Sequence, residues 1–380
     1  MSDNKLIQES NSLQEANSTY EANSTHEDKK LEDPYKTSQV SDSTDINKIF
    51  QRKKVHTKKS IWNMIILSLC ILGFFCFAAL FLEDILLPSY QSNKSAQLTR
   101  ELYEASNVIK PSLGPVASIT TNTPNPDSIQ DSQGQLLQFK ELLAECADVK
   151  GWLTIPDTNI DYVVTQGWAN DPNFYLDKDI YGNYNKAGTL YLDIRGSVEE
   201  NSQNLVIHGH NMVSTKEKMF HNLLDYKKTS YYKEHPLITF DTIYSTGQWK
   251  VFAVFISNGS DNKEPLFDYR KATFKDSSEF LNFVYQIRVR SILNTNVDIN
   301  EKDQILCLST CSYEVENYRT VVVARKVRQG EAPTVDVEHV ELNKAPLYPS
   351  SYYYRYGGKA PKLYETFEEA FEHGVISWYN

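Results

Sequence analysis

Three residues with the side chains needed for acyl transfer lie at the ends of short apolar runs. Cys311 ends the run at 305–311, Arg319 opens the next run, and His210 follows a third run at 204–208. A cysteine thiol has an ordinary pKa of about 8.5 and needs a nearby imidazolium or guanidinium to gain thiolate character. A histidine can protonate the leaving amine and deprotonate the incoming nucleophile. An arginine can bind the developing oxyanion or align the substrate backbone.

Each of these residues also has an ordinary structural interpretation. A cysteine at a strand end is more often a packing residue, and a single arginine is usually solvated or paired on the surface. The local sequence favours chemistry, because Leu-Ser-Thr-Cys ends at Cys311, an arginine follows at Arg319, and Gly-His-Asn-Met surrounds His210.

Composition excludes several classes of protein. The 380-residue chain carries a net charge of −10, which argues against a nucleic-acid-binding protein because such proteins usually present a basic face. Its five cysteines do not form a disulfide framework. Cys307 and Cys311 are separated by roughly 13 Å of strand, too far for a bridge. A bridge from Cys146 to Cys307 stays open, although two buried free thiols are the favoured interpretation.

The N-terminal part of the chain predicts a membrane anchor. Residues 61–82 are almost uninterruptedly apolar and would form a helix of roughly 33 Å, enough to span a bilayer. Five basic residues precede this run and two acidic residues follow it, which predicts a cytoplasmic N-terminus and an extracellular remainder. A cleaved signal peptide is the alternative, but the run is long, starts late and lacks a small-residue cleavage site. The polar residues 1–60 are predicted to be a disordered cytoplasmic tail.

Beyond the anchor, the pattern predicts a stalk and then one folded domain. Residues 83–132 contain a helical repeat followed by a Pro- and Ser-rich stretch and are interpreted as an extracellular stalk. An amphipathic helix at 136–146 then leads into eight strand-like runs at 152–155, 160–164, 189–193, 204–208, 237–242, 249–256, 305–309 and 319–326. This number of short strands predicts a mainly β fold, a closed barrel or a sandwich.

A strong helical pattern interrupts the strands before the last two. Asp276 is its expected N-cap, Glu279 completes a capping box, and Phe280, Phe283 and Ile287 form an apolar stripe that predicts core packing. After residue 327 the chain becomes irregular through a tyrosine-rich segment and ends in a short helix capped by Thr366. Residues 330–380 therefore form an extension to which the sequence assigns no role.

The set of motifs resembles the sortase family of Gram-positive bacteria. Its Thr-Leu-x-Thr-Cys signature matches residues 307–311, except that Cys307 replaces the first threonine. The resemblance covers residues 133–327 and includes, in the correct order, the motifs at 151–156, 159–162, 181–182 and 186–189. It implies an eight-stranded sortase barrel at 133–329 with catalytic His210, Cys311 and Arg319. Ser309 and Thr310 are expected to line the substrate cleft beside the thiol, although they equally fit as strand fillers.

The N-terminal helices and the helix before the last strands resemble class B of this family. That resemblance implies a membrane-anchored cysteine transpeptidase that cleaves a C-terminal sorting signal of secreted proteins after threonine, through a thioester at Cys311. The acceptor would be an amine of the cell wall precursor or, in a pilin-polymerising member, a lysine of a pilin. No cofactor and no metal are expected.

Two departures from the family pattern leave alternatives open. His208 stands where class B members often have tyrosine, so a His-x-His pair results, and the family pattern favours His210 as the catalytic residue. The pair could instead bind a metal, but no third ligand follows at a recognised spacing. The extension after residue 327 is the second departure. A surface cysteine hydrolase and an anchored, non-catalytic scaffold are the remaining alternatives.

Overall fold

The computed structural model describes residues 44–107, 130–212, 218–259 and 265–379. The chain divides into two compact units, Met1–Gly73 and Phe74–Asn380. Most of the predicted cytoplasmic tail and the second half of the predicted stalk lie outside the described residues.

A long apolar helix lies near the N-terminus. Helix α1 extends over Thr44–Phe81, and its part Lys58–Phe81 is long and apolar enough to cross a membrane. This part contains nearly all of the span predicted at 61–82. Its length and composition are compatible with a single-pass anchor. A π-helical turn, η1 (Leu82–Leu86), connects α1 to α2 (Leu87–Asn107).

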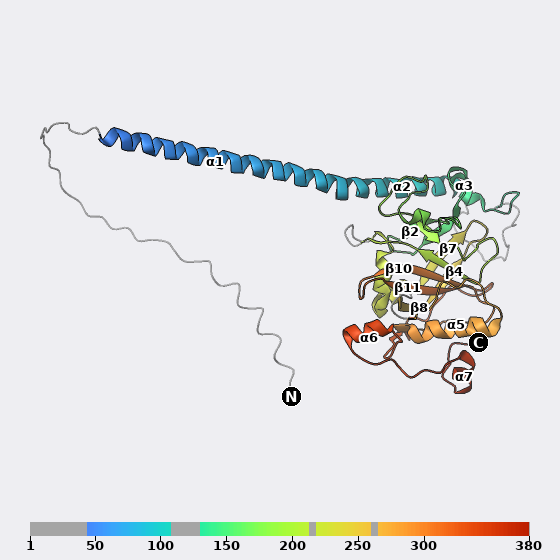
Figure 1. Ribbon diagram of the computed structural model, residues 1–380. Helices are drawn as coiled ribbons and strands as arrows, with labels where there is room; N and C mark the ends of the chain where they lie inside the picture. The colour runs from blue at the N-terminus through green and yellow to red at the C-terminus, as the bar shows by residue number, and fades with distance from the viewer. Residues whose placement is uncertain (1–43, 108–129, 213–217, 260–264, 380) are drawn as a thin grey trace, which may run out of the picture. The chain divides into compact units, whose positions relative to one another are not determined.

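Eight strands pair side by side into a closed barrel in the order β1-β2-β3-β4-β10-β11-β8-β7 (Figure 1). All eight predicted strand runs correspond to strands of this barrel. The largest differences in their bounds are at the ends of β1, β8 and β10. The strands are β1 (Val149–Thr154), β2 (Asp161–Thr165), β3 (Leu190–Leu192), β4 (Asn204–His208), β7 (Leu237–Thr242), β8 (Gln248–Asn258), β10 (Ile305–Ser312) and β11 (Tyr318–Lys326).

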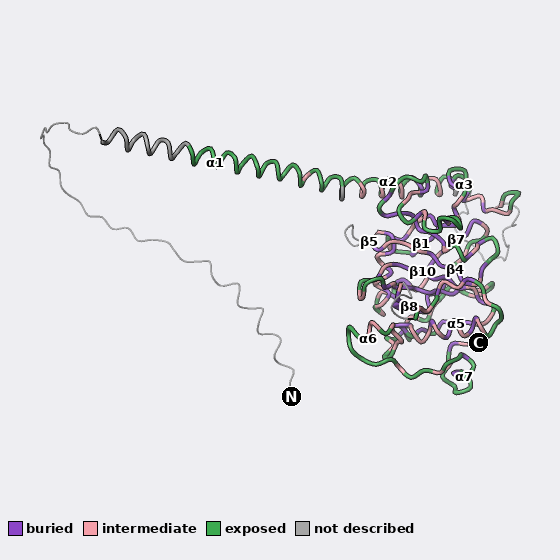
Figure 2. The backbone as a smooth tube through the Cα atoms, in the orientation of Figure 1, coloured by how far each residue is buried: buried purple, intermediate pink, exposed green. Residues whose placement is uncertain are grey.

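Successive side chains of a strand point to opposite faces of the sheet, and the two faces belong to two hydrophobic clusters. Figure 2 shows buried residues along the strands. Leu306 and Leu308 of β10 belong to the cluster inside the barrel. Cys307 belongs to the second cluster, between the barrel and helix α5 (Ser277–Arg290). Because Cys311 has the same parity as Cys307, it lies on the outward face of β10.

Helix α5 begins where the capping pattern predicts. The Asp276 side chain accepts a hydrogen bond from the Glu279 backbone N–H at 2.9 Å. The Glu279 carboxylate in turn accepts from the backbone N–H of Lys275 at 2.6 Å. The helix ends at Arg290. The predicted apolar stripe is buried against the outer face of the barrel.

Helix α2 packs on the barrel, which corrects the interpretation of its residues as a free stalk. The Tyr103 ring stacks on the Trp152 indole with centroids 4.4 Å apart. The Arg100 guanidinium lies 2.5 Å from the Asp161 carboxylate. The folded domain therefore includes Leu87–Asn107. The amphipathic helix predicted at 136–146 is also shorter, because η3 (Leu137–Phe139) and α3 (Lys140–Glu145) replace it.

Short elements complete the described fold. A two-stranded sheet joins β5 (Asn211–Met212) to β6 (Lys218–Met219), and another joins β9 (Leu293–Asn294) to β12 (Glu341–Leu342). The helical segments are η4 (Phe174–Leu176), η5 (His221–Lys227), α4 (Thr229–Glu234), α6 (Ser350–Tyr356) and α7 (Phe367–Glu372). Thr366 caps α7, as predicted, by accepting from the Glu369 backbone N–H at 3.1 Å.

The buried cysteines are not bridged. Cys146 and Cys307 are free thiols, the favoured interpretation of the sequence. Cys307 Sγ donates to Asn204 Oδ1 at 3.4 Å, and burial raises the pKa of this thiol far above its ordinary value. Cys146 Sγ instead lies 3.5 Å from the Tyr175 hydroxyl, in the other hydrophobic cluster.

Candidate active site

The pairing of β10 with β11 brings Cys311 and Arg319 together. These two residues are directly opposite each other in the antiparallel register. Directly opposed residues have Cα atoms about 4.5–5.5 Å apart and side chains on one face of the sheet. The thiol and the guanidinium therefore project from adjacent strands toward the same side.

The pairing of β10 with β4 brings His210 to the same rim of the barrel. The Gly209 backbone N–H donates to the Ser309 carbonyl at 3.2 Å, and the Thr310 hydroxyl donates to the Gly209 carbonyl at 2.9 Å. His210 and Cys311 each follow directly after one of these bonded residues. Two hydrogen bonds thus fix the backbone beside the imidazole to the backbone beside the thiol.

Backbone bonding determines the tautomer of His210. Its Nε2 lies 2.9 Å from the Leu176 carbonyl, which can only accept, so Nε2 carries a proton. In the neutral ring Nδ1 is then the basic nitrogen. Burial lowers the pKa of His210 below its ordinary value, and Arg319 lowers it further, while the Leu176 bond and Asp177 act in the opposite direction. The imidazole is therefore predominantly neutral at pH 7.

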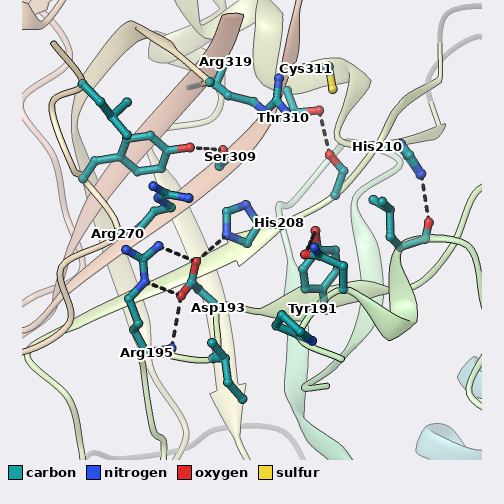
Figure 3. A pocket seen from close by; sticks show the side chains of 18 of the residues that line it. Tyr191, Asp193, Arg195, His208, His210, Arg270, Ser309, Thr310, Cys311 and Arg319 are labelled. Atoms are coloured by element: carbon teal, nitrogen blue, oxygen red, sulfur yellow. Dashed lines mark hydrogen bonds and ion pairs between the residues drawn. The ribbon is translucent and has the colours of Figure 1, made fainter. Parts of the chain in front are cut away.

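The three side chains line one cavity of about 470 Å³. Figure 3 shows Cys311 at the rim of this cavity, with Arg319 and His210 on either side of it in that view. Cys311 is partly exposed and so accessible from the cavity. The polar and charged residues that line the cavity besides these three are Asn173, Tyr191, Asp193, Arg195, His208, Asn258, Tyr269, Arg270, Ser309 and Thr310.

Comparisons with known proteins agree on one family. Residues 153–327 match the sortase domain. The chain is 30% identical over 193 residues to sortase B of Staphylococcus aureus, which covers 50% of this chain and 75% of that protein. It is 30% identical over 197 residues to sortase B of Listeria monocytogenes, covering 52% and 74%. The chain belongs to the sortase family.

Both relatives are class B sortases, and the chain is a sortase of this class, a cysteine transpeptidase. A solved Staphylococcus aureus sortase B–substrate complex has the same fold, with a TM-score of 0.51 and 24% identity over 64% of this chain and 99% of that one. The sortase match ends at residue 327, directly after β11, so the C-terminal extension lies beyond it.

Ser309 and Thr310 of this sortase line the cavity, but their hydroxyls have partners within the protein. Ser309 Oγ lies 2.9 Å from the Tyr269 hydroxyl, and Thr310 bonds the Gly209 carbonyl. Both residues are 1% exposed. These hydrogen bonds hold the two side chains in place in the cavity lining. A contact of either residue with substrate stays a prediction.

His208 has surroundings different from those of His210. Strand β4 ends at His208, so the alternation that would point both rings the same way does not continue to His210. His208 Nε2 lies 3.1 Å from Asp193 Oδ2, and its ring contacts Tyr191 at 5.3 Å between centroids. Figure 3 shows His208 directed to Asp193 and His210 directed away from it. The two imidazoles therefore do not share a partner.

A network of ion pairs that the sequence did not reveal lies at one side of the cavity. Arg195 Nε and Nη2 donate to the Asp193 carboxylate at 2.8 and 2.9 Å. Arg195 Nη1 reaches Asp268 at 3.2 Å, and Arg270 Nε donates to the same Asp268 at 3.1 Å. Burial raises the pKa of Asp193, but the bonds from Arg195 and His208 outweigh it and hold that pKa well below its usual range. Asp193 is therefore ionised and fixes His208.

The backbone of Cys311 also has a fixed position. The Asn211 side chain donates through Nδ2 to the Cys311 carbonyl at 3.0 Å, and its Oδ1 lies 2.7 Å from His221 Nδ1. Asn211 is 7% exposed. Its place directly after His210 is the only signal in the sequence for this contact.

Gly209, between the two histidines, has no room for a side chain. A Cβ atom there would lie 2.4 Å from Leu190 Cδ2 and 2.8 Å from Phe220 Cδ2. We expect Gly209→Ala to lower the free energy of unfolding by about 1–3 kcal/mol, the usual cost of overpacking, and to reduce activity by displacing His210. Denaturant unfolding and turnover of the purified variant measure the two effects.

Gly196→Ala is the matched control. Its Cβ would meet Leu205 Cδ2 at 3.5 Å, an ordinary contact. Equal stability of the two variants would contradict the close packing inferred around Gly209.

Proposed function

We propose that this sortase is anchored by the helix at 58–81, with residues 83–380 outside the cell, and that it attaches secreted proteins to an amine. It would cleave a C-terminal sorting signal after threonine and form a thioester at Cys311. The observation that carries this proposal is the register that sets Cys311 opposite Arg319, beside the bonded pair of Gly209 and Thr310. The basic residues before the span and the acidic ones after it support the orientation.

In the acylation step, neutral His210 takes the proton of the Cys311 thiol on Nδ1, and the Cys311 sulfur attacks the carbonyl carbon of the signal's threonine. A C–S bond forms, the scissile C–N bond breaks, and the leaving amine takes its proton from the His210 imidazolium. In the second step, an amine gives a proton to neutral His210 and attacks the thioester. A C–N bond forms, and the Cys311 sulfur leaves as the thiolate.

Arg319 has the donors for the oxyanion of both tetrahedral intermediates. A guanidinium has five N–H groups. Within the residues that the structure describes, Arg319 bonds through Nη1, to the Tyr318 carbonyl at 3.0 Å and the Asn317 carbonyl at 3.4 Å. The N–H groups on Nε and Nη2 remain for a substrate oxygen.

The acceptor would be an amine of the cell wall precursor or a pilin lysine, and the proteins attached would be secreted proteins with a C-terminal sorting signal. The Staphylococcus aureus relative was solved as a substrate complex, which supports a peptide ligand in the corresponding cavity. The proposed partners also include the membrane itself, through the apolar helix.

The test uses the detergent-solubilised full chain and a pool of fluorescent peptides with threonine fixed at the fourth position of a five-residue motif. Mass spectrometry would detect the peptide on Cys311, and added triglycine would convert the product from acid to amide. Thioester with amide product supports the proposal. Acid alone would indicate a hydrolase, and failure of a peptide-like electrophile to label Cys311 would indicate a scaffold.

Replacing Arg319 distinguishes its proposed role from simple charge. We expect Arg319→Ala to reduce kcat for thioester formation by about 10²–10³-fold, the usual effect of losing an oxyanion donor. Arg319→Lys keeps the charge but loses the planar fork, so it should recover only part of the rate. Stopped-flow measurement of peptide cleavage gives both rates.

Alkylation of Cys311 by iodoacetamide is the control, because that reaction forms no oxyanion. An unchanged alkylation rate in Arg319→Ala is expected. A parallel loss of alkylation would show that Arg319 acts on the thiol instead.

A further inference from the structure

The C-terminal extension returns to the barrel along the end of helix α5. Strand β12 pairs with β9, and the Asn343 backbone N–H donates to the Ile292 carbonyl at 2.8 Å. The Asn343 side chain donates to the Ser291 carbonyl at 2.8 Å, and the Leu347 N–H donates to the Val289 carbonyl at 2.8 Å. These bonds hold the chain just before α6, which lies near one end of α5 in Figure 1.

The tyrosines around α6 pack against the end of β11 that precedes Arg319. Tyr318 is 2% exposed and forms a small buried cluster with Ile256 and Ile292. Tyr348 and Tyr352 cover this cluster, with their own rings stacked at 4.0 Å between centroids. The Tyr318 hydroxyl also bonds the Ser351 hydroxyl.

The same helix reaches the turn between β10 and β11. The Tyr356 hydroxyl donates to the Glu314 carbonyl at 2.6 Å. From the other side, the Glu314 carboxylate accepts from Lys227 and from Ser312. The turn that joins Cys311 to Arg319 is therefore held both by η5 of the barrel domain and by the extension.

The geometry of this turn controls the arginine more directly than the cysteine. Arg319 bonds the carbonyls of Asn317 and Tyr318, which belong to the turn and to the strand start that the tyrosines cover. Cys311 is held separately, by Asn211. The Tyr313 hydroxyl donates to the Asn211 carbonyl at 3.2 Å, so the first residue of the turn belongs to the support of Cys311. A movement of residues 314–318 would thus displace the guanidinium more than the thiol.

We propose that Tyr348, Tyr352 and Tyr356 of the extension are positioning residues for Arg319, so that residues beyond the sortase match complete the active site of this chain. The inference rests on the proposed role of Arg319 in acyl transfer. A mutation far from the reacting atoms that displaces a catalytic group by about 1 Å can lower a rate by about 10²-fold. Residues that support the turn should therefore have a measurable effect on the rate.

Tyr352→Ala in the full chain tests the proposal. We expect kcat for thioester formation from the threonine-containing peptide pool to fall about tenfold, with little change in KM. Hydrogen exchange of residues 313–319 should rise, while exchange in β1 and β2 stays unchanged. Alkylation of Cys311 by iodoacetamide should stay at the wild-type rate. Tyr352→Phe keeps the stacked ring and should restore the cleavage rate.

Tyr354→Ala is the matched control, because Tyr354 lies in the same helix and is 96% exposed. It should behave like the wild type in every measurement. A double-mutant cycle adds a second check: if Tyr352 acts through Arg319, Tyr352→Ala has little effect in the Arg319→Ala background.

Several outcomes would overturn the proposal. A wild-type cleavage rate in Tyr352→Ala would do so. So would additive losses in the double mutant, or equal losses of cleavage and alkylation that follow a lower melting temperature, since these indicate general destabilisation. If the wild type forms no thioester with the peptide pool, the proposed function fails. Unchanged hydrogen exchange at 313–319 in Tyr352→Ala would then separately overturn the positioning role of the tyrosines.

Discussion

Replacing Cys311 with alanine is expected to abolish thioester formation and to reduce transpeptidation by about 10⁴-fold or more. In the proposed mechanism the sulfur forms the covalent intermediate, and no other described thiol lines the cavity. Mass spectrometry of the enzyme after incubation with the peptide pool should show the acyl adduct on wild type and no adduct on Cys311→Ala. The amide product with triglycine should disappear in parallel.

Cys307→Ala provides the matched control in the same strand. Cys307 is fully buried, and its thiol stays protonated because burial raises its pKa. We expect this variant to form the adduct at a rate per folded molecule close to that of wild type. An adduct that persists in Cys311→Ala, or that is lost in Cys307→Ala while the protein stays folded, would show that the nucleophile is assigned to the wrong sulfur.

The strands that carry the site were predictable because their signal is local. Two mostly apolar runs, one ending at Cys311 and one opening at Arg319, each have the length of a strand. Asp276 marks the start of α5. Period-2 alternation further separates the inner Leu308 from the outward Cys307. The resemblance to the family motifs then indicates which three residues form the site.

The remaining features depend on contacts between distant segments. Arg195 meets Asp268 across 73 residues of sequence, and nothing near either residue indicates the other. The sequence predicts a stalk at helix α2 because a Pro- and Ser-rich stretch follows its helical repeat, while the stacking of Tyr103 on Trp152 depends on the folded barrel. The tyrosines of α6 lack helical periodicity, so their role is visible only where they cover Tyr318.

Replacing His210 with alanine is expected to lower transpeptidation by about 10²–10⁴-fold, the usual contribution of general acid–base catalysis. His208→Ala should keep most of the activity, because His208 bonds Asp193 rather than a group beside the thiol, and Arg195 keeps Asp193 paired without it. Steady-state kinetics give the rate of transpeptidation for both variants and so compare the two histidines directly. Equal losses would show that the imidazole role belongs to His208 or is shared.

The pH dependence provides an independent test of the same residue. In the proposed mechanism neutral His210 accepts a proton from the incoming amine, so aminolysis of the thioester should slow as pH falls and the ring becomes protonated. Burial, with Arg319 nearby, lowers the pKa of His210 below its ordinary value of 6.5. The acid limb of the profile for aminolysis is therefore expected below pH 6.5, and His208→Ala should leave it in place. Single-turnover aminolysis of preformed acyl-enzyme by methoxyamine measures it, because methoxyamine is a weaker base than hydroxylamine and stays largely unprotonated near pH 6. A limb above pH 6.5 would require an imidazole stabilised in its charged form, contrary to the effect of burial and of Arg319 on this ring.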